Sequence, residues 1–189
     1  MAERAAGEPW DELMINELFA PLGMNSSGFG APGSTAKLDQ PWGHYEGRTR
    51  IVPVEPGLVG DSPPALGPAG TIHASLDDMG RYLSANLLGA RGRGWLLEPE
   101  TFLRLHRPLG GEDYALGWVV VASPLAGCLA LTHAGSNLNW HSVAWVMPVL
   151  NIALFVVTNQ GGEAGFRAAD EAVGALMRYA GETIPGIAR

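Results

Sequence analysis

The chain has 189 residues, of which 47% are hydrophobic, and its formal net charge is −7. An acidic chain without a Lys/Arg cluster repels phosphate backbones, so we expect no nucleic-acid partner. The single cysteine, Cys128, excludes an internal disulfide and a metal site built from several cysteines. No apolar run approaches the ~18 residues of a membrane span. The first twenty residues contain no apolar signal-peptide core, and the compartment stays undetermined.

Residues 1–113 are predicted to form helices and loops. A helix is expected over Pro9–Phe19, followed by a stop at Pro21. From Gly23 to Pro68, glycine, proline and serine interrupt any periodicity, and a short strand pair is expected within Tyr45–Val54. The first helix has apolar residues on one face, at i, i+3, i+4 and i+8: Trp10, Leu13, Met14 and Leu18.

Two further helices are predicted in this part of the chain. Ser75–Leu88 begins with a serine N-cap, carries Asp78 three residues later, and is expected to end with Gly89 in the C′ position. Pro99–His106 is shorter, with Phe102 and Leu103 on its apolar side together with His106. The expected buried face of the longer helix consists of Leu76, Met79, Leu83 and Leu87.

Residues 114–189 are predicted to form a sheet and a terminal helix. Ile152–Thr158 is apolar on both faces, which predicts a central, covered strand. The terminal helix is expected over Ala164–Ala180, with Gly181 as its cap. Four strands are expected: Ala115–Ala122, Cys128–His133, Ser142–Met147 and Ile152–Thr158. The expected buried face of the helix consists of Ala169, Val173, Leu176, Met177 and Ala180.

These elements predict one α/β domain of the α+β type over residues 1–189. Residues 1–113 would form its helical and loop part, and residues 114–189 an antiparallel sheet with a covering helix. Such a sheet has a thin core and exposed edges, which proteins usually protect. We therefore expect the sheet to receive further strands from elsewhere.

The stretch Leu129–Asn137 is the best candidate for chemistry. It reads as a strand entering a glycine-bearing turn, with His133 at the boundary. Backbone N–H groups and polar side chains along such a strand can clamp a carbonyl-bearing substrate, and Gly135 permits a close approach. His133 would supply a proton donor or a positive charge. The simpler alternative is a histidine at a strand end before a Gly-Ser-Asn turn.

Five segments, in order, resemble motifs of the serine β-lactamase, penicillin-binding-protein and esterase superfamily, near its class C branch. They cover nearly the whole chain, and their combination is more specific than any one of them. The segments are Phe19–Met24 with Gly28–Gly30 (PLGM…GFG), Gly67–Ser75 with Asp77–Met79 (PAG…S.DDM), Tyr114–Trp118 (YALGW), His133–Asn137 (HAGSN) and Phe155–Asn159 (FVVTN).

The resemblance implies acyl transfer through a serine ester, on an ester, amide or lactam. It places His133 where the family has the Lys or His of its Lys-Thr-Gly motif. Gly135 would leave room for the substrate, and Ser136 and Asn137 would bind it at the cleft rim. The implied ligand is a small acyl substrate or a peptidoglycan-like molecule. No cofactor is expected, and no metal, because the histidines lack metal-ligand spacing.

One departure from the family pattern concerns the nucleophile. The family carries a Ser-x-x-Lys and a Tyr-x-Asn upstream of the PLGM segment, which begins here near Phe19. We therefore expect both motifs, and two strands of the sheet, to precede Met1. This interpretation makes the chain the C-terminal portion of a serine hydrolase, truncated at its N-terminus and with little or no activity alone.

Two other serines were weighed as nucleophiles. Ser34-Thr-Ala-Lys37 is the one Ser-x-x-Lys of the sequence, but prolines flank it closely and it has no apolar stripe to bury. Gly60-Asp61-Ser62 has no strand leading in and two prolines following. We expect neither to be catalytic. The alternatives are a non-catalytic binding module with a remnant cleft, self-association through an exposed sheet edge, or a misplaced start at Met1.

Overall fold

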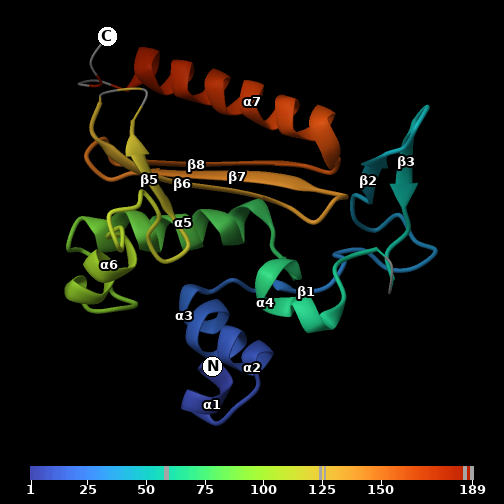
Figure 1. Cartoon of the computed structure of the whole chain (residues 1–189), viewed down its shortest axis with the longest axis horizontal. Coiled ribbons are helices and arrows are strands. Elements are labelled where there is room, and N and C mark those ends of the chain that lie inside the picture. The colour runs from blue at the N-terminus through green and yellow to red at the C-terminus, as the bar shows by residue number, and fades with distance from the viewer. Residues whose placement is uncertain (58–59, 124, 126, 185–186, 188–189) are drawn as a thin grey trace. The chain divides into compact units, whose positions relative to one another are not determined.

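The computed structural model describes residues 1–57, 60–123, 125, 127–184 and 187. The chain forms two compact units: unit 1 comprises Met1–Tyr82, Ser136–His141 and Asn159–Gly165, and unit 2 comprises Leu83–Gly135, Ser142–Thr158 and Phe166–Arg189. Figure 1 shows the mixture of helices and antiparallel strands that the sequence predicts, so the α+β fold class is confirmed.

Unit 1 begins with a short helix, α1 (Ala2–Ala6), and then a longer helical run. The run joins α2 (Trp10–Met14), a π-helical turn η1 (Ile15–Phe19) and α3 (Ala20–Leu22). Its apolar face packs on an aromatic residue from the next segment, because the ring centroid of Phe29 lies 5.1 Å from that of Trp10 and 5.7 Å from that of Phe19.

The expectation that Pro21 ends this helix is wrong. In a regular α-helix the proline ring would meet the carbonyl of Glu17. The π-helical turn covers Glu17 and widens the helix there, so the chain continues through Pro21. It ends at Gly23, whose φ of 68° is the left-handed conformation that favours glycine.

The rest of unit 1 is built from short elements. β1 (Gly28–Phe29) pairs antiparallel with β4 (Ile72–His73). The expected strand pair is confirmed as a hairpin of β2 (Gly43–Glu46) and β3 (Ile51–Val54). A 3-10 turn, η2 (Pro64–Leu66), leads into the one-turn helix α4 (Gly67–Gly70).

Unit 2 contains most of a four-stranded sheet in the order β5-β6-β7-β8. All four predicted strands are present, and helix α7 (Gly162–Thr183) lies along one face of the sheet (Figure 1). The core between them contains Ala130, Met147, Val173 and Met177. The strands are β5 (Val119–Ala122), β6 (Leu129–Ser136), β7 (His141–Met147) and β8 (Ile152–Thr158).

Three expectations about the sheet and α7 are wrong. β8 is an edge strand of the described sheet rather than a central one. The apolar residues on its two faces indicate that both faces are covered, but they do not indicate whether another strand lies on each side. Gly181 lies inside α7, which continues to Thr183. Leu176 is exposed, whereas the other predicted residues of the buried face, Ala169, Val173, Met177 and Ala180, are buried.

Helix α5 (Leu76–Ala90) begins as predicted. The backbone N–H of Asp78 donates to the Ser75 hydroxyl at 3.2 Å, which confirms Ser75 as the N-cap. The Asp78 carboxylate does not turn back to Ser75. It is buried and accepts hydrogen bonds from the Ser26 backbone (2.8 Å) and the Ser27 hydroxyl (2.9 Å). Leu76 is exposed, contrary to expectation, because it precedes the packed part of the helix.

The predicted C′ glycine, Gly89, lies inside α5. A Cβ on Gly89 would clash with the ring of Phe102, so the glycine serves close packing rather than helix termination. Termination falls at Gly92, whose φ is 68°. Its N–H bonds the carbonyl of Gly89 and the N–H of Arg93 bonds that of Leu88, which together form a Schellman motif.

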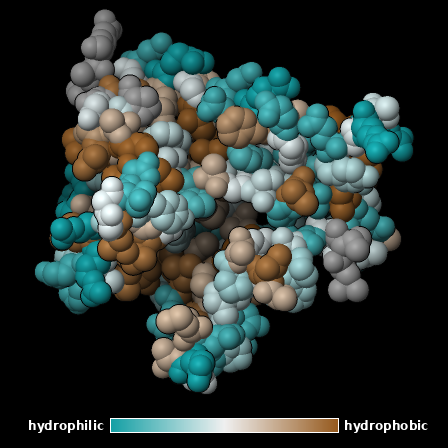
Figure 2. Space-filling model, viewed as in Figure 1, coloured by the Kyte–Doolittle hydropathy of each residue, from teal (hydrophilic) through white to brown (hydrophobic). Residues whose placement is uncertain are grey.

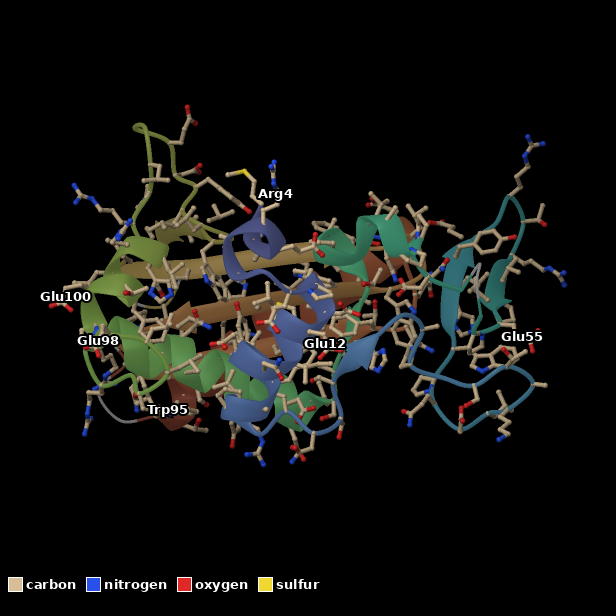
Figure 3. All side chains as sticks on the ribbon, turned by 90° about the horizontal axis from the view of Figure 1, so that it is seen from below. Arg4, Glu12, Glu55, Trp95, Glu98 and Glu100 are labelled. Carbon is tan, nitrogen blue, oxygen red and sulfur yellow. The ribbon has the colours of Figure 1, made fainter. Side chains whose placement is uncertain are left out.

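Helix α6 (Pro99–Leu105) follows, as predicted. Phe102 is 2% exposed, but Leu103 is 63% exposed and does not share its buried side. Glu98 and Glu100 lie at the N-terminal end of α6 (Figure 3), where carboxylates favour the helix dipole. Figure 2 shows apolar and polar residues interspersed on the face of the molecule that it draws.

Candidate functional site

Strand β6 changes from buried to exposed along its length. Ala130 and Leu131 are buried, Thr132 is half-buried, and His133–Ser136 are exposed. The Thr132 hydroxyl donates to the carbonyl of Ala144 on β7 at 2.9 Å and holds the strand at the transition. The strand continues to Ser136, so His133 lies inside it and not at its end as the sequence suggested.

His133 has one hydrogen-bond partner that the sequence did not indicate. Its Nε2 lies 3.2 Å from the hydroxyl oxygen of Tyr114, and the two rings meet edge to face with centroids 6.2 Å apart. Tyr114 belongs to the YALGW segment, whose expected strand is replaced by a turn before β5. The phenol therefore contacts the imidazole, which remains exposed.

Gly135 lies two residues further along β6. A Cβ built at this position would meet no atom within 4 Å, so packing inside the protein does not require glycine here. The space beside the strand is open, which suits the predicted close approach of a ligand to the backbone.

The turn after β6 belongs to unit 1 and is held by its own polar side chains. The Ser136 hydroxyl donates to the Trp140 carbonyl at 2.6 Å. The Asn137 side-chain amide donates to the Asp61 carboxylate at 2.6 Å, and its carbonyl accepts from the Trp140 backbone at 3.1 Å. Ser136 and Asn137 thus shape the turn, and Asp61 is an anchor that no sequence pattern signalled.

Ser34 and Lys37 lie in a turn rather than on a helix. The Lys37 N–H donates to the Ser34 carbonyl at 3.2 Å, and Ala36 has a φ of 58°. Hydrogen bonds from the Ser34 side chain and backbone lower the pKa of the Asp39 carboxyl. The Ser34 backbone N–H donates to the Asp39 carboxylate at 2.9 Å, and this turn does not match the helical nucleophile and base pair of a Ser-x-x-Lys motif.

His106 is a half-buried histidine of unit 2. It lies between the rings of Phe102 and Trp118, and its Nε2 is 3.0 Å from the Asn86 side-chain oxygen. Its Nδ1 is buried without a hydrogen-bond partner among the described residues. Burial lowers the pKa of His106, so we assign it a neutral, structural role.

The described part of the chain offers no candidate for two further kinds of site. No group of three or more His, Cys, Asp or Glu side chains there is arranged to hold a metal ion. No helix built from those residues is long and apolar enough to cross a membrane. Cys128 is half-buried beside β6.

Comparisons with known proteins identify relatives of this fold. A family model described as beta-lactamase matches residues 1–177. A comparison with curated proteins returned no match. Similar solved structures include an octameric penicillin-binding protein homologue from Pyrococcus abyssi (22% identity, TM-score 0.71) and a penicillin-binding protein from Bacillus halodurans (20%, 0.69). A D-amino acid amidase from Ochrobactrum anthropi SV3 is also similar (15%, 0.70).

The matches cover the chain and its relatives unequally. The three alignments include 93%, 92% and 96% of this chain, but 39%, 51% and 55% of the respective solved structures. The chain therefore spans between two fifths and just over half the length of these structures. At these identities the structural similarity establishes the shared fold alone.

Proposed function

Because the chain belongs to the beta-lactamase family, we propose that it forms one wall of a serine-hydrolase cleft. His133 would face the reacting carbonyl, Gly135 would leave room for the substrate, and Ser136 and Asn137 would line the rim. The observation that carries this proposal is the exposed half of β6, where a histidine and an unobstructed glycine follow a firmly packed strand.

The proposed reaction is acyl transfer through a serine ester. A serine hydroxyl attacks an ester, amide or lactam carbonyl, the alcohol or amine leaves with a proton, and water then releases the acid and restores the serine. In this chain the Ser-x-x-Lys sequence forms a turn rather than a helix, and the Ser34 backbone N–H donates to the Asp39 carboxylate. We therefore place the nucleophile and its base outside these 189 residues, and expect the chain alone to be inactive.

The names of similar structures support a proposal for the substrate class. The similar structures carry the names penicillin-binding protein and D-amino acid amidase. We propose a small acyl substrate or a peptidoglycan-like peptide as the ligand of the completed cleft.

The test uses the chain with nitrocefin and with p-nitrophenyl esters, followed by mass spectrometry after a fluorophosphonate that labels active serines. We expect neither turnover nor a covalent adduct. An adduct or turnover that disappears in Ser34→Ala would overturn the proposed position of the nucleophile. Reading the coding DNA immediately upstream is the complementary test, and an in-frame Ser-x-x-Lys followed by Tyr-x-Asn is the expected result.

A second candidate function is self-association through β8. This strand is an edge of the described sheet although it is apolar on both faces, and an unpaired edge can add another strand. One similar structure is an octamer. Size-exclusion chromatography with light scattering tests it: Val157→Pro on the edge should dissociate an oligomer, whereas Val149→Lys in the preceding turn should not.

A further inference from the structure

We propose that Tyr114 is a positioning residue that fixes the orientation and the tautomer of His133. The catalytic importance of this role rests on the proposed function, since His133 is the side chain that would face the substrate. The observation behind it is the 3.2 Å contact between the Tyr114 hydroxyl and His133 Nε2.

The backbone around Tyr114 explains why the phenol reaches the imidazole. Val119 pairs with Thr132 on β6, and on its other side it forms an antiparallel bridge with Tyr114. The intervening turn is closed by the Ala115 N–H, which donates to the Trp118 carbonyl at 2.7 Å, and Gly117 adopts a φ of 87°. These contacts fix the backbone of Tyr114 beside Val119, and from there its hydroxyl lies 3.2 Å from His133 Nε2.

The surroundings of the pair explain why one contact has a large effect. His133 is exposed, and Tyr114 is 45% exposed, so no close packing confines the imidazole. The ring would otherwise sample several rotamers and both neutral tautomers. The hydroxyl and the edge-to-face contact of the two rings are the restraints that the fold supplies.

A hydroxyl can donate to a bare Nε2 or accept from an Nε2–H, and donation is favoured here because a phenol is the stronger acid and the imidazole nitrogen the stronger base. A neutral imidazole has one N–H and one bare nitrogen. When Tyr114 donates its proton to Nε2, the histidine proton resides on Nδ1. When the imidazole gains a second proton, Nε2–H donates to the phenol oxygen, because a hydroxyl both donates and accepts. Phenylalanine can do neither, so Tyr114→Phe removes this control while retaining the ring.

The experiment is nitrogen NMR of the chain labelled at its histidine rings, at a pH where the imidazole is neutral. His133→Gln assigns the signal. We expect the two ring-nitrogen shifts of His133 to indicate an Nδ1–H ring in the natural chain. In Tyr114→Phe they should move toward an averaged or Nε2–H pattern. Tyr179→Phe, an exposed tyrosine on α7, is the matched control and should leave the shifts unchanged.

The signals of the other histidines verify that Tyr114→Phe retains the fold. Unchanged His133 shifts in this folded variant would overturn the positioning role. So would an Nε2–H ring in the natural chain. The measurement needs no substrate, so its result does not depend on the hydrolase assays. A shift in Tyr114→Phe without any hydrolase activity in the completed protein would retain the positioning role and reject the proposed function.

Discussion

Gly89→Ala should destabilise the protein although it replaces a glycine in the middle of a helix. Such a replacement normally stabilises a helix by about 1 kcal/mol. Here the added methyl group would overlap the ring of Phe102, which is 2% exposed. A Cβ on Gly94 would lie 2.6 Å from another atom of the same ring, so two glycines approach the ring closely and it has little room to move.

The magnitude follows from two opposing contributions. Overpacking a filled site costs about 1–3 kcal/mol, and more when the neighbours cannot yield. Subtracting the gain of about 1 kcal/mol in helix propensity leaves an expected net loss of about 0–2 kcal/mol, and we expect the upper end of this range because the ring has little room to move. Gly80→Ala is the matched control, because this residue lies exposed on the same helix and its added Cβ would meet no atom within 4 Å. It should stabilise the protein by about 1 kcal/mol.

Urea unfolding followed by far-UV circular dichroism measures both free energies of unfolding. Gly89→Ala combined with Phe102→Leu should recover part of the loss, because a smaller side chain leaves space for the methyl group. Equal stabilisation by Gly89→Ala and Gly80→Ala would refute the packing argument. It would indicate that Gly89 is an ordinary helical glycine.

Three further predictions concern the turn after β6 and the half-buried histidine. Gly161→Ala would place a methyl group on the Leu138 carbonyl oxygen, and we expect a loss of about 2 kcal/mol or more in urea unfolding. Asn137→Asp would put a second carboxylate beside Asp61, and we expect a loss of about 1–3 kcal/mol at neutral pH that high salt reduces. Burial lowers the pKa of His106 below its unfolded value of 6.5, so the unfolded chain binds a proton at this imidazole more readily than the folded chain does. We therefore expect the free energy of unfolding to keep its full value above pH 6.5 and to decrease as the pH falls toward the pKa of the folded state.

Each of these predictions has a matched comparison. Gly174→Ala on α7 should not destabilise, since its added Cβ would lie 3.4 Å from the flexible end of Arg178. Asn137→Ala should show no salt dependence, because it removes the hydrogen bond without adding charge. His106→Gln should flatten the decline of unfolding free energy below pH 6.5, and a decline as steep as in the natural chain would reject the assignment to His106.

Local sequence signals predicted which elements form, but tertiary contacts set several of their limits. The serine at position 75 caps α5 as expected, since an N-cap needs a side chain and a backbone N–H only three residues apart. Gly89 packs against the ring of Phe102 inside the helix, and the helix ends at Gly92 instead. No local pattern connects Phe102 with either glycine. The position of β8 at the sheet edge also could not be predicted locally, because the hydropathy of a strand indicates which faces are covered and not which strands lie beside it.

The candidate site was likewise predicted in part: its contiguous motif was found from the sequence, and the residues that support it were not. His133 and Gly135 came from a short contiguous motif, and the structure places both on the exposed half of β6. Their supporting residues were missed because they come from distant segments. Tyr114 lies 19 residues before His133, and Asp61 lies 76 residues before Asn137. No periodicity connects such pairs.

The two halves of β6 separate stability from the proposed function. Ala130 belongs to the core with Met147, so a substitution there would alter the fold itself. His133 and Gly135 contribute little to that core because they are exposed. A change in their chemistry should therefore leave the free energy of unfolding nearly constant, within about 0.5 kcal/mol for His133→Gln. A loss of hydrolysis by that variant of a completed enzyme would then reflect the cleft and not a damaged fold.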